Sequence, residues 1–180
     1  WIGTDMHRAL LRAEGEREDG RTTGNRLELL WAHPVAAYWD LVAGVRMDTG
    51  PGTTRNYVGI GVQGLAPQWL HVEATAWGGE RGQTAATLKL EYEWLLTNRL
   101  ILTPKIETDI YGKDDTVNEI GNGISDVKAG LRLRYEIRRE FAPYVGIEWT
   151  GKFGDTADLA RSNDEAVRDA HLVVGLRFWF

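Results

Sequence analysis

The sequence contains no cysteine, which excludes disulfide bonds, zinc–thiolate sites and thiol catalysis. Only five of its 180 residues are proline, and no apolar run approaches the roughly 18 residues of a transmembrane helix. It also lacks an excess of positive charge, because 21 Lys and Arg stand against 26 Asp and Glu. A nucleic-acid-binding surface is therefore not expected. The length favours one domain that spans residues 1–180.

What the sequence does contain is alternation of apolar and polar residues. Helical periodicity is nearly absent, whereas a period of two recurs along most of the chain. In residues 55–64, for example, Val58, Ile60 and Val62 share one face, and small or polar residues share the other. We count ten such segments, each close to the roughly 9–11 residues with which a tilted strand crosses a bilayer.

The connections between these segments alternate in length. The short ones fall at residues 32–37, 65–68, 96–99 and 138–140. The longer, polar ones fall at residues 18–24, 49–54, 78–83, 112–124 and 151–169. An even number of strands, with short turns at one end and long loops at the other, is typical of outer-membrane barrels. We therefore predict an all-β fold, a transmembrane antiparallel up-and-down β-barrel of about ten strands, with short periplasmic turns, longer extracellular loops and outer-membrane lipid around it.

A soluble β-barrel or sandwich is the alternative, since it would show the same alternation with its apolar face inside. The charges favour the membrane barrel, because nearly every strand carries two or more of them on its polar face. The short-turn end is also rich in aromatic residues, as an interfacial girdle is. These residues are Trp31, Tyr38, Trp39, Trp69, Trp94, Phe141 and Trp179.

The hairpin registers expected from the loops place several inward-facing charges opposite partners. The predicted pairs in the lumen are Glu91 with Lys105, Lys89 with Glu107, Asp48 with Arg55, and Arg132 with Glu148. Such cross-strand pairs stabilise a sheet modestly. Ten strands enclose little more than packed side chains and some water, so we expect a narrow polar path rather than a wide pore.

The same registers predict a metal site in the periplasmic half of the lumen. They place His71 opposite Glu93 and Glu73 opposite Glu91, and imidazole beside carboxylates suits copper or zinc. A hydrogen-bonded histidine within a polar plug is the alternative interpretation. Near the periplasmic mouth, the adjacent Met6 and His7 add a soft and a borderline ligand. The candidate metal ligands are therefore His71, Glu93, Glu73, Glu91, His7 and Met6.

One enzymatic arrangement has to be weighed. Asp114 and Asp115 are adjacent, and Asp169 and His171 are two residues apart, at the long-loop ends of strands. Ten-stranded outer-membrane proteases activate water with an Asp pair and an Asp–His pair near the rim. Here the first pair lies in a glycine-rich loop and lacks the intervening residue, so we do not expect an enzyme.

Four long strings and the carboxyl end GLRFWF closely resemble the copper resistance protein B family. The strings cover Tyr38–Gly52, Gly61–Trp77, Asn98–Asp115 and Ala129–Arg161. The resemblance implies a Gram-negative outer-membrane protein that acts in copper tolerance beside periplasmic copper-handling partners. It also implies a Met/His-rich amino-terminal segment before the barrel, which this sequence lacks.

From the residues and the resemblance together, we expect a barrel that binds copper ions in a narrow polar lumen. The ions would bind around His71 and Glu93, with His7 and Met6 at the periplasmic mouth, and would pass or be held at the outer membrane. Two alternatives stay open. One is a rim-located outer-membrane protease, and the other is a structural barrel that docks a periplasmic multicopper oxidase.

Overall fold

The computed structural model describes residues 2–4, 6–18, 21–49, 53–114, 121–138, 141–162 and 166–178. Nearly all of them lie in strands. Ten strands are long, with nine to 16 residues, whereas two further strands have two residues each. The strands are β1 (Ile2–Gly3), β2 (Arg8–Glu18), β3 (Arg21–Ala36), β4 (Trp39–Thr49), β5 (Arg55–Ala66), β6 (Leu70–Gly79), β7 (Thr84–Tyr92), β8 (Trp94–Leu95), β9 (Leu100–Tyr111), β10 (Gly123–Tyr135), β11 (Phe141–Lys152) and β12 (Arg168–Phe178).

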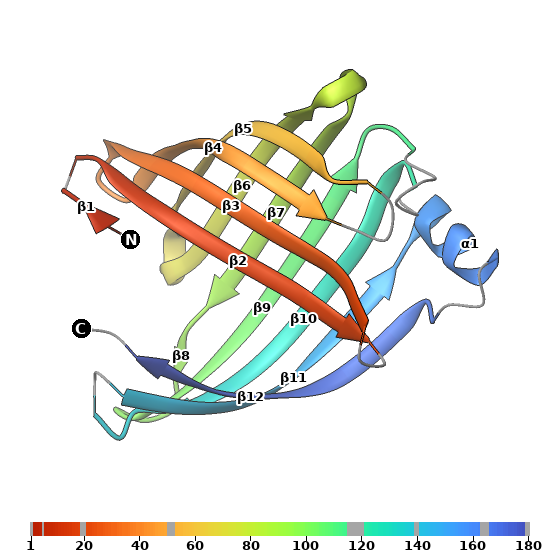
Figure 1. The fold of residues 1–180 in the computed structure, drawn as a ribbon. Coiled ribbons are helices and arrows are strands. Elements are labelled where there is room, and N and C mark those ends of the chain that lie inside the picture. Colours follow the sequence, from red (N-terminus) through yellow and green to blue (C-terminus); the bar gives the residue numbers. More distant parts are fainter. Residues whose placement is uncertain are drawn as a thin grey trace.

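The strands form a single sheet with up-and-down topology. Each long strand pairs antiparallel with the long strands next to it in the chain, and β8 pairs with β9. The sheet curls round a central space, so that β2 and β12 return toward the same side of the molecule (Figure 1). The predicted antiparallel β-barrel with ten long strands is confirmed.

Both described ends of the chain lie at the end of the barrel that carries the short turns (Figure 1). The opposite end differs from the sequence prediction in two places. The predicted loop at 18–24 is largely strand, because β2 continues to Glu18 and β3 begins at Arg21. The predicted loop at 151–169 contains a helix, α1 (Gly154–Ser162). Ala157 and Ala160 of α1 are buried, and the hydroxyl of Thr156 accepts a hydrogen bond from the backbone N–H of Gly121 at 2.9 Å.

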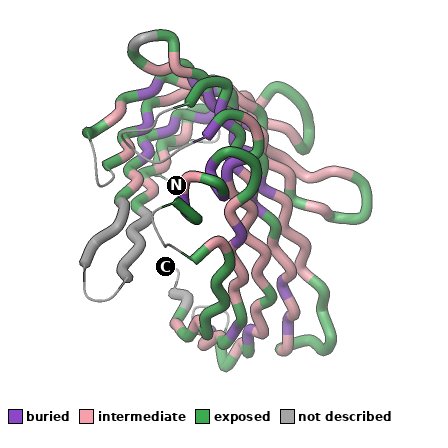
Figure 2. The backbone as a smooth tube through the Cα atoms, turned by 90° about the vertical axis from the view of Figure 1, so that its right-hand side faces the viewer, coloured by how far each residue is buried: buried purple, intermediate pink, exposed green. Residues whose placement is uncertain are grey.

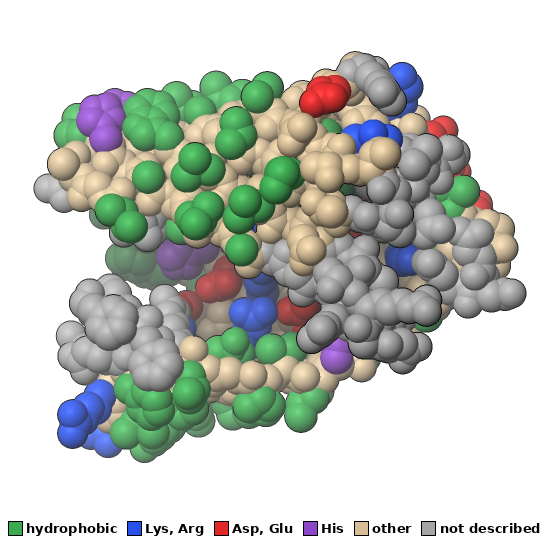
Figure 3. Space-filling view, viewed as in Figure 1, with side chains coloured by type: hydrophobic (Ala, Val, Ile, Leu, Met, Phe, Trp, Pro, Cys, Tyr) green, Lys and Arg blue, Asp and Glu red, His purple; other side chains and the backbone are tan. Residues whose placement is uncertain are grey.

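The barrel is apolar outside and charged inside. Val58, Ile147 and Leu172 are 65%, 61% and 71% exposed on its outer face. Glu28 and Arg46 are among the most deeply buried side chains. The tube coloured by burial shows that buried residues occur at intervals along the strands, between exposed and intermediate ones (Figure 2). The space-filling view shows hydrophobic side chains over the outer wall (Figure 3). Among the described residues, no helix combines the length and the apolar character needed to cross a membrane.

Candidate metal-binding lumen

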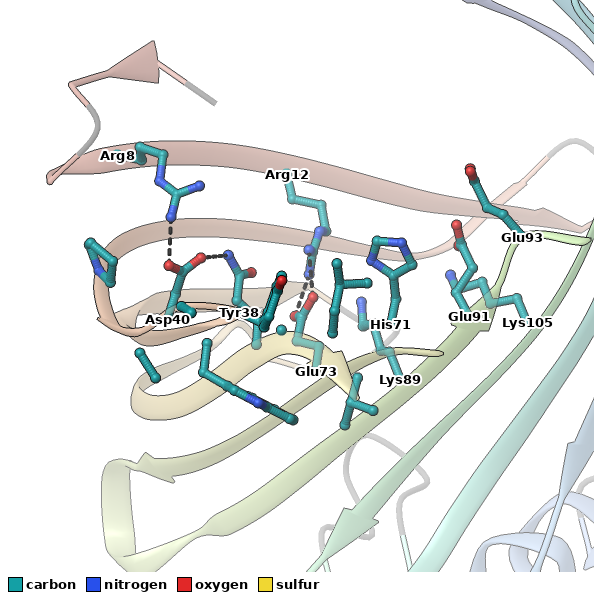
Figure 4. Close-up of a pocket in the computed structure, with 18 residues that line it drawn as sticks. Arg8, Arg12, Tyr38, Asp40, His71, Glu73, Lys89, Glu91, Glu93 and Lys105 are labelled. Atoms are coloured by element: carbon teal, nitrogen blue, oxygen red, sulfur yellow. Dashed lines mark hydrogen bonds and ion pairs between the residues drawn. The ribbon is translucent and has the colours of Figure 1, made fainter. Parts of the chain in front are cut away.

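A water-accessible cavity of about 810 Å³ occupies the short-turn half of the lumen. We call it the vestibule. Residues of the short turns around Tyr38 and Leu65 form part of its wall. In Figure 4, Arg8 and Asp40 lie at one side of the labelled residues, and Glu91 and Glu93 lie at the other. The polar residues that line it include Arg8, Arg12, Asp40, Gln63, His71, Glu73, Lys89, Glu91, Glu93 and Lys105.

Arginine side chains from β2 cross the vestibule to acidic partners. Arg8 donates to Asp40 at 2.6 Å. Arg12 donates to Glu28 at 2.9 Å and makes two hydrogen bonds with Glu73 at 3.0 and 3.1 Å (Figure 4). Because β2 and β6 are not neighbours in the sheet, the Arg12–Glu73 contact joins opposite walls of the lumen. Alternation along β2 puts both arginines on one face, but hairpin registers do not reveal contacts between distant strands.

His71 and Glu91 lie directly opposite each other on β6 and β7, and both line the vestibule. Within the described part of the chain, neither side chain makes a hydrogen bond or an ion pair. Both are accessible from the cavity, and His71 is exposed. The pair therefore offers an imidazole and a carboxylate for which no described residue competes.

This register corrects the sequence prediction. His71 lies opposite Glu91 rather than Glu93, and Glu73 lies opposite Lys89 rather than Glu91. The loop between β6 and β7 closes through a hydrogen bond from the backbone N–H of Gly79 to the carbonyl of Gln83, at 2.7 Å. This closure shifts the pairing by two residues from the predicted register. A shift of two keeps each side chain on its predicted face and changes only its partner.

Glu73 and Glu93 face the same cavity but hold arginine partners. Glu93 pairs with Arg134 at 3.0 Å, and Glu73 is held by Arg12. Both carboxylates are therefore less available to a cation than that of Glu91.

The other predicted pairs have mixed outcomes. Lys89 lies opposite Glu107, with 3.0 Å between their charged atoms, and Lys105 also contacts Glu107, at 2.9 Å. Glu91 lies opposite Lys105 and Asp48 opposite Arg55, as predicted.

The prediction for Arg132 was wrong in register. Arg132 lies opposite Gly146, and Glu148 lies opposite Gly130. The guanidinium of Arg132 nevertheless reaches Glu148 diagonally, at 3.1 Å.

The long-loop half of the lumen is filled by a packed network of charges, which we call the plug. Its centre is Arg46, whose side chain is fully buried. Arg46 donates to Asp48 at 2.5 Å and to the hydroxyl of Tyr111 at 2.9 Å. Arg26 pairs with Asp109 at 2.9 Å, and the hydroxyl of Thr87 also donates to Asp109, at 2.7 Å. Of these residues, only Asp48 belonged to a predicted lumen pair.

Met6 and His7 lie at the short-turn rim, where the sequence placed them, but the ring of His7 does not enter the lumen. His7 stacks on Trp31 and His33, with ring centroids 5.7 and 5.2 Å apart. Trp31 and His33 alternate along β3 with inward-facing residues, so this ring cluster belongs to the outer face of the rim. The Nδ1 atom of His33 lies 2.8 Å from the carbonyl oxygen of Met6. His7 therefore faces away from the lumen.

The residues considered for catalysis are brought together only in part. The Nδ1 atom of His171 lies 3.2 Å from Asp169, and both side chains are more than half exposed. Asp114 accepts a hydrogen bond from the backbone of Asn122 at 2.6 Å, while Asp115 lies outside the described residues.

In the part of the chain that the structure describes, no three His, Asp or Glu side chains are grouped closely enough to hold a metal ion. The vestibule thus presents pairs of donors rather than a closed coordination cage. Bound water would have to complete the coordination of an ion held by His71 and Glu91.

Comparison with known proteins places this geometry in a family. The chain is 52% identical over all its 180 residues to a copper resistance protein B homolog of Pseudomonas syringae pv. tomato, and 46% identical to copper resistance protein B of Escherichia coli. It spans 61% of the length of each of these relatives. Among solved structures, the KdgM porin shares the fold, with a TM-score of 0.53 and 11% identity over 97% of this chain and 96% of the porin.

The model of one family, described as copper resistance protein B precursor, matches residues 1–180. The resemblance predicted from the sequence strings is thereby confirmed, and the chain belongs to the copper resistance protein B family.

Proposed function

We propose that this barrel lies in the outer membrane and binds copper ions weakly in its vestibule, where it helps their passage or sequestration. The observation that carries the proposal is that His71 lies opposite Glu91 on β6 and β7, in a water-accessible cavity. Neither side chain has a hydrogen-bond or ion-pair partner among the residues that the structure describes. Membership of the family supports a role in copper resistance, and the apolar outer face of the barrel is suited to contact with lipid.

The chemistry of the vestibule suits an ion in transit. Imidazole and carboxylate are suitable ligands for Cu(II), and two protein donors completed by water hold an ion loosely. Passage requires binding that is favourable enough for entry and weak enough for release. Glu73 and Glu93 line the same cavity and are the next available donors, although each must first leave its arginine.

Copper binding by the protein in detergent tests the proposal, with zinc as the comparison ion. We expect one weak Cu(II) site whose electron paramagnetic resonance spectrum shows nitrogen coordination. His71→Ala should abolish that nitrogen signal. Glu91→Gln should weaken copper binding at least tenfold, because loss of even an outer-shell partner costs roughly 10–100-fold in metal affinity.

The matched control is His171→Ala, which removes an exposed imidazole from the long-loop end of the lumen. It should leave the copper site unchanged. If the folded barrel bound no copper, or if His71→Ala kept the full nitrogen signal, the vestibule would not be the site. The barrel would then serve as a structural unit, such as a docking surface for a periplasmic multicopper oxidase.

The same His171→Ala variant tests the protease alternative, which the 3.2 Å contact between His171 and Asp169 keeps open. Peptide cleavage by the wild type that disappears in this variant would establish that activity. We expect no cleavage by either protein.

A further inference from the structure

The wall of the barrel is open along one side. Within the described residues, β12 pairs with β11 alone, and β2 pairs with β1 and β3, so β2 and β12 are not joined to each other. The two strands run as separate edges in Figure 1, and the space-filling view shows charged lumen side chains through an opening between them (Figures 1 and 3).

An opening of this kind is incompatible with a bilayer. Unpaired backbone N–H and C=O groups cost several kcal/mol each in hydrocarbon, which is why only closed barrels cross membranes with strands. The charged groups inside would also meet lipid directly. Some strand must therefore complete the wall between β2 and β12.

The short strand β1 shows where that strand starts. Ile2 lies opposite Ala9 and Gly3 opposite Arg8, so β1 begins to cover the free edge of β2. A tight turn joins the two strands, with the backbone N–H of Thr4 donating to the carbonyl of His7 at 2.9 Å. Chain that continued β1 backward from Ile2 would run along β2 toward the long-loop end.

One added strand would not suffice. β1 runs from the long-loop end to the short-turn end, as β12 does, so a single strand would have to pair with β12 in parallel. A second strand before β1 makes both new contacts antiparallel and raises the number of long strands from ten to an even twelve.

We propose that two antiparallel strands, contributed by polypeptide on the amino-terminal side of Trp1, close the wall between β2 and β12. The relatives, of which this chain spans 61%, have the additional length that such strands need.

The register of β1 makes the proposal specific. Since Ile2 lies opposite Ala9, the residue immediately before Trp1 would lie opposite Leu11 and share its outer face. Strands separated by two others lie roughly 14 Å apart, whereas a disulfide needs Cα atoms about 4.4–6.8 Å apart. A disulfide between cysteines on β2 and β12 can therefore form only if the two strands are in direct contact, and not if two other strands lie between them.

The test uses protein that includes the polypeptide before Trp1, oxidised in outer membranes, with any other cysteine removed. Leu11→Cys paired with Leu29→Cys is the control, because these residues lie opposite each other on β2 and β3. We expect Leu11→Cys to form a disulfide with a cysteine placed immediately before Trp1, at a yield comparable to the control. The three outer-face positions of β12, Leu172→Cys, Val174→Cys and Leu176→Cys, should give none with Leu11→Cys.

Three results would overturn the proposal. A disulfide between Leu11→Cys and any of the β12 cysteines would show that ten strands close directly. Disulfide-linked dimers formed through Leu11→Cys would show that a second copy covers the edge. A working control pair with no cross-link to the residue before Trp1 would show that β1 does not continue along β2. None of these results depends on copper binding, so the wall and the metal site are tested separately.

Discussion

The two halves of the lumen contain the same kinds of residue and use them differently. In the plug, Arg46 and Arg26 lie among Asp48, Asp109 and Tyr111, with almost every polar group turned toward another. In the vestibule, arginines also meet carboxylates, but the side chains surround a cavity of about 810 Å³ and His71 and Glu91 stay unpaired within the described residues. The difference shows that packing, rather than composition, separates a structural network from a candidate binding site.

Aromatic residues account for part of this contrast. In the plug, the guanidinium of Arg46 lies over Tyr57 and Trp77, at 5.4 and 5.7 Å from their ring centroids. These rings fill space and exclude water, which strengthens the ion pairs and raises the cost of breaking them. Trp77 lies on the inward face of β6 in the plug. Where the same face of β6 reaches the vestibule, it carries His71 and Glu73 instead of an aromatic ring. Water can therefore reach the charges there.

The largest expected effect is on stability in the plug. Arg46→Ala removes the guanidinium that donates to the hydroxyl of Tyr111 and one of the two arginines that hold the carboxylate of Asp48. Removing one member of a buried charge network costs about 3–5 kcal/mol, and we expect that loss in the free energy of unfolding. Denaturant unfolding in detergent micelles, followed by tryptophan fluorescence, measures it.

The matched control for Arg46→Ala is Arg8→Ala in the vestibule, where the side chain of Arg8 is one-third exposed beside Asp40. We expect a loss of about 1 kcal/mol or less, because water screens this pair. Equal losses for the two variants would show that the plug and the vestibule do not differ in this way.

The sequence predicted the faces of the strands well because the period of two is set by local geometry. Lys89 and Glu107 were also paired correctly, since the short connection at 96–99 leaves little freedom of register. His71 was given the wrong partner because the register depends on how the four residues between β6 and β7 close the hairpin. The hydrogen bond between Gly79 and Gln83 that closes it could not be predicted from composition. The face on which His71 lies was therefore predicted correctly, although its cross-strand partner was not.

The plug could not be predicted for a different reason. Arg26 on β3 meets Asp109 on β9, and Arg46 on β4 meets Tyr111 on β9. These strands are not neighbours, so the contacts depend on how tightly the sheet curls. Hairpin registers relate only adjacent strands.

An intermediate effect is expected at Arg12, which binds Glu73 across the vestibule. Arg12→Ala should cost roughly 1.5–3 kcal/mol of unfolding free energy, the usual range for a hydrogen bond to a charged group. It should also strengthen copper binding several-fold, because the released Glu73 lies on the same face of β6 as His71. Copper titration in detergent measures the change.

The double variant Arg12→Ala, Glu73→Gln is the control for that gain. It removes the guanidinium and also the carboxylate of Glu73. The carboxylate of Glu28, the other partner of Arg12, is buried and does not line the vestibule, so copper affinity should return close to the wild-type value. A gain that persisted in the double variant would mean that Arg12 repels the ion directly rather than by occupying Glu73.

The smallest expected effect on stability is at His71, where the effect on copper binding is largest. Since His71 is exposed in the vestibule and has no protein partner within the described residues, His71→Ala should change the unfolding free energy by no more than about 0.5 kcal/mol. Trp77, on the same face of β6, is buried and donates a hydrogen bond to Thr87 at 3.2 Å. Trp77→Ala should therefore cost about 3–5 kcal/mol, as for a large core residue. A loss of unfolding free energy for His71→Ala near that for Trp77→Ala would show that His71 is part of the packed structure. Its position opposite Glu91 would then be explained by packing, without a bound metal.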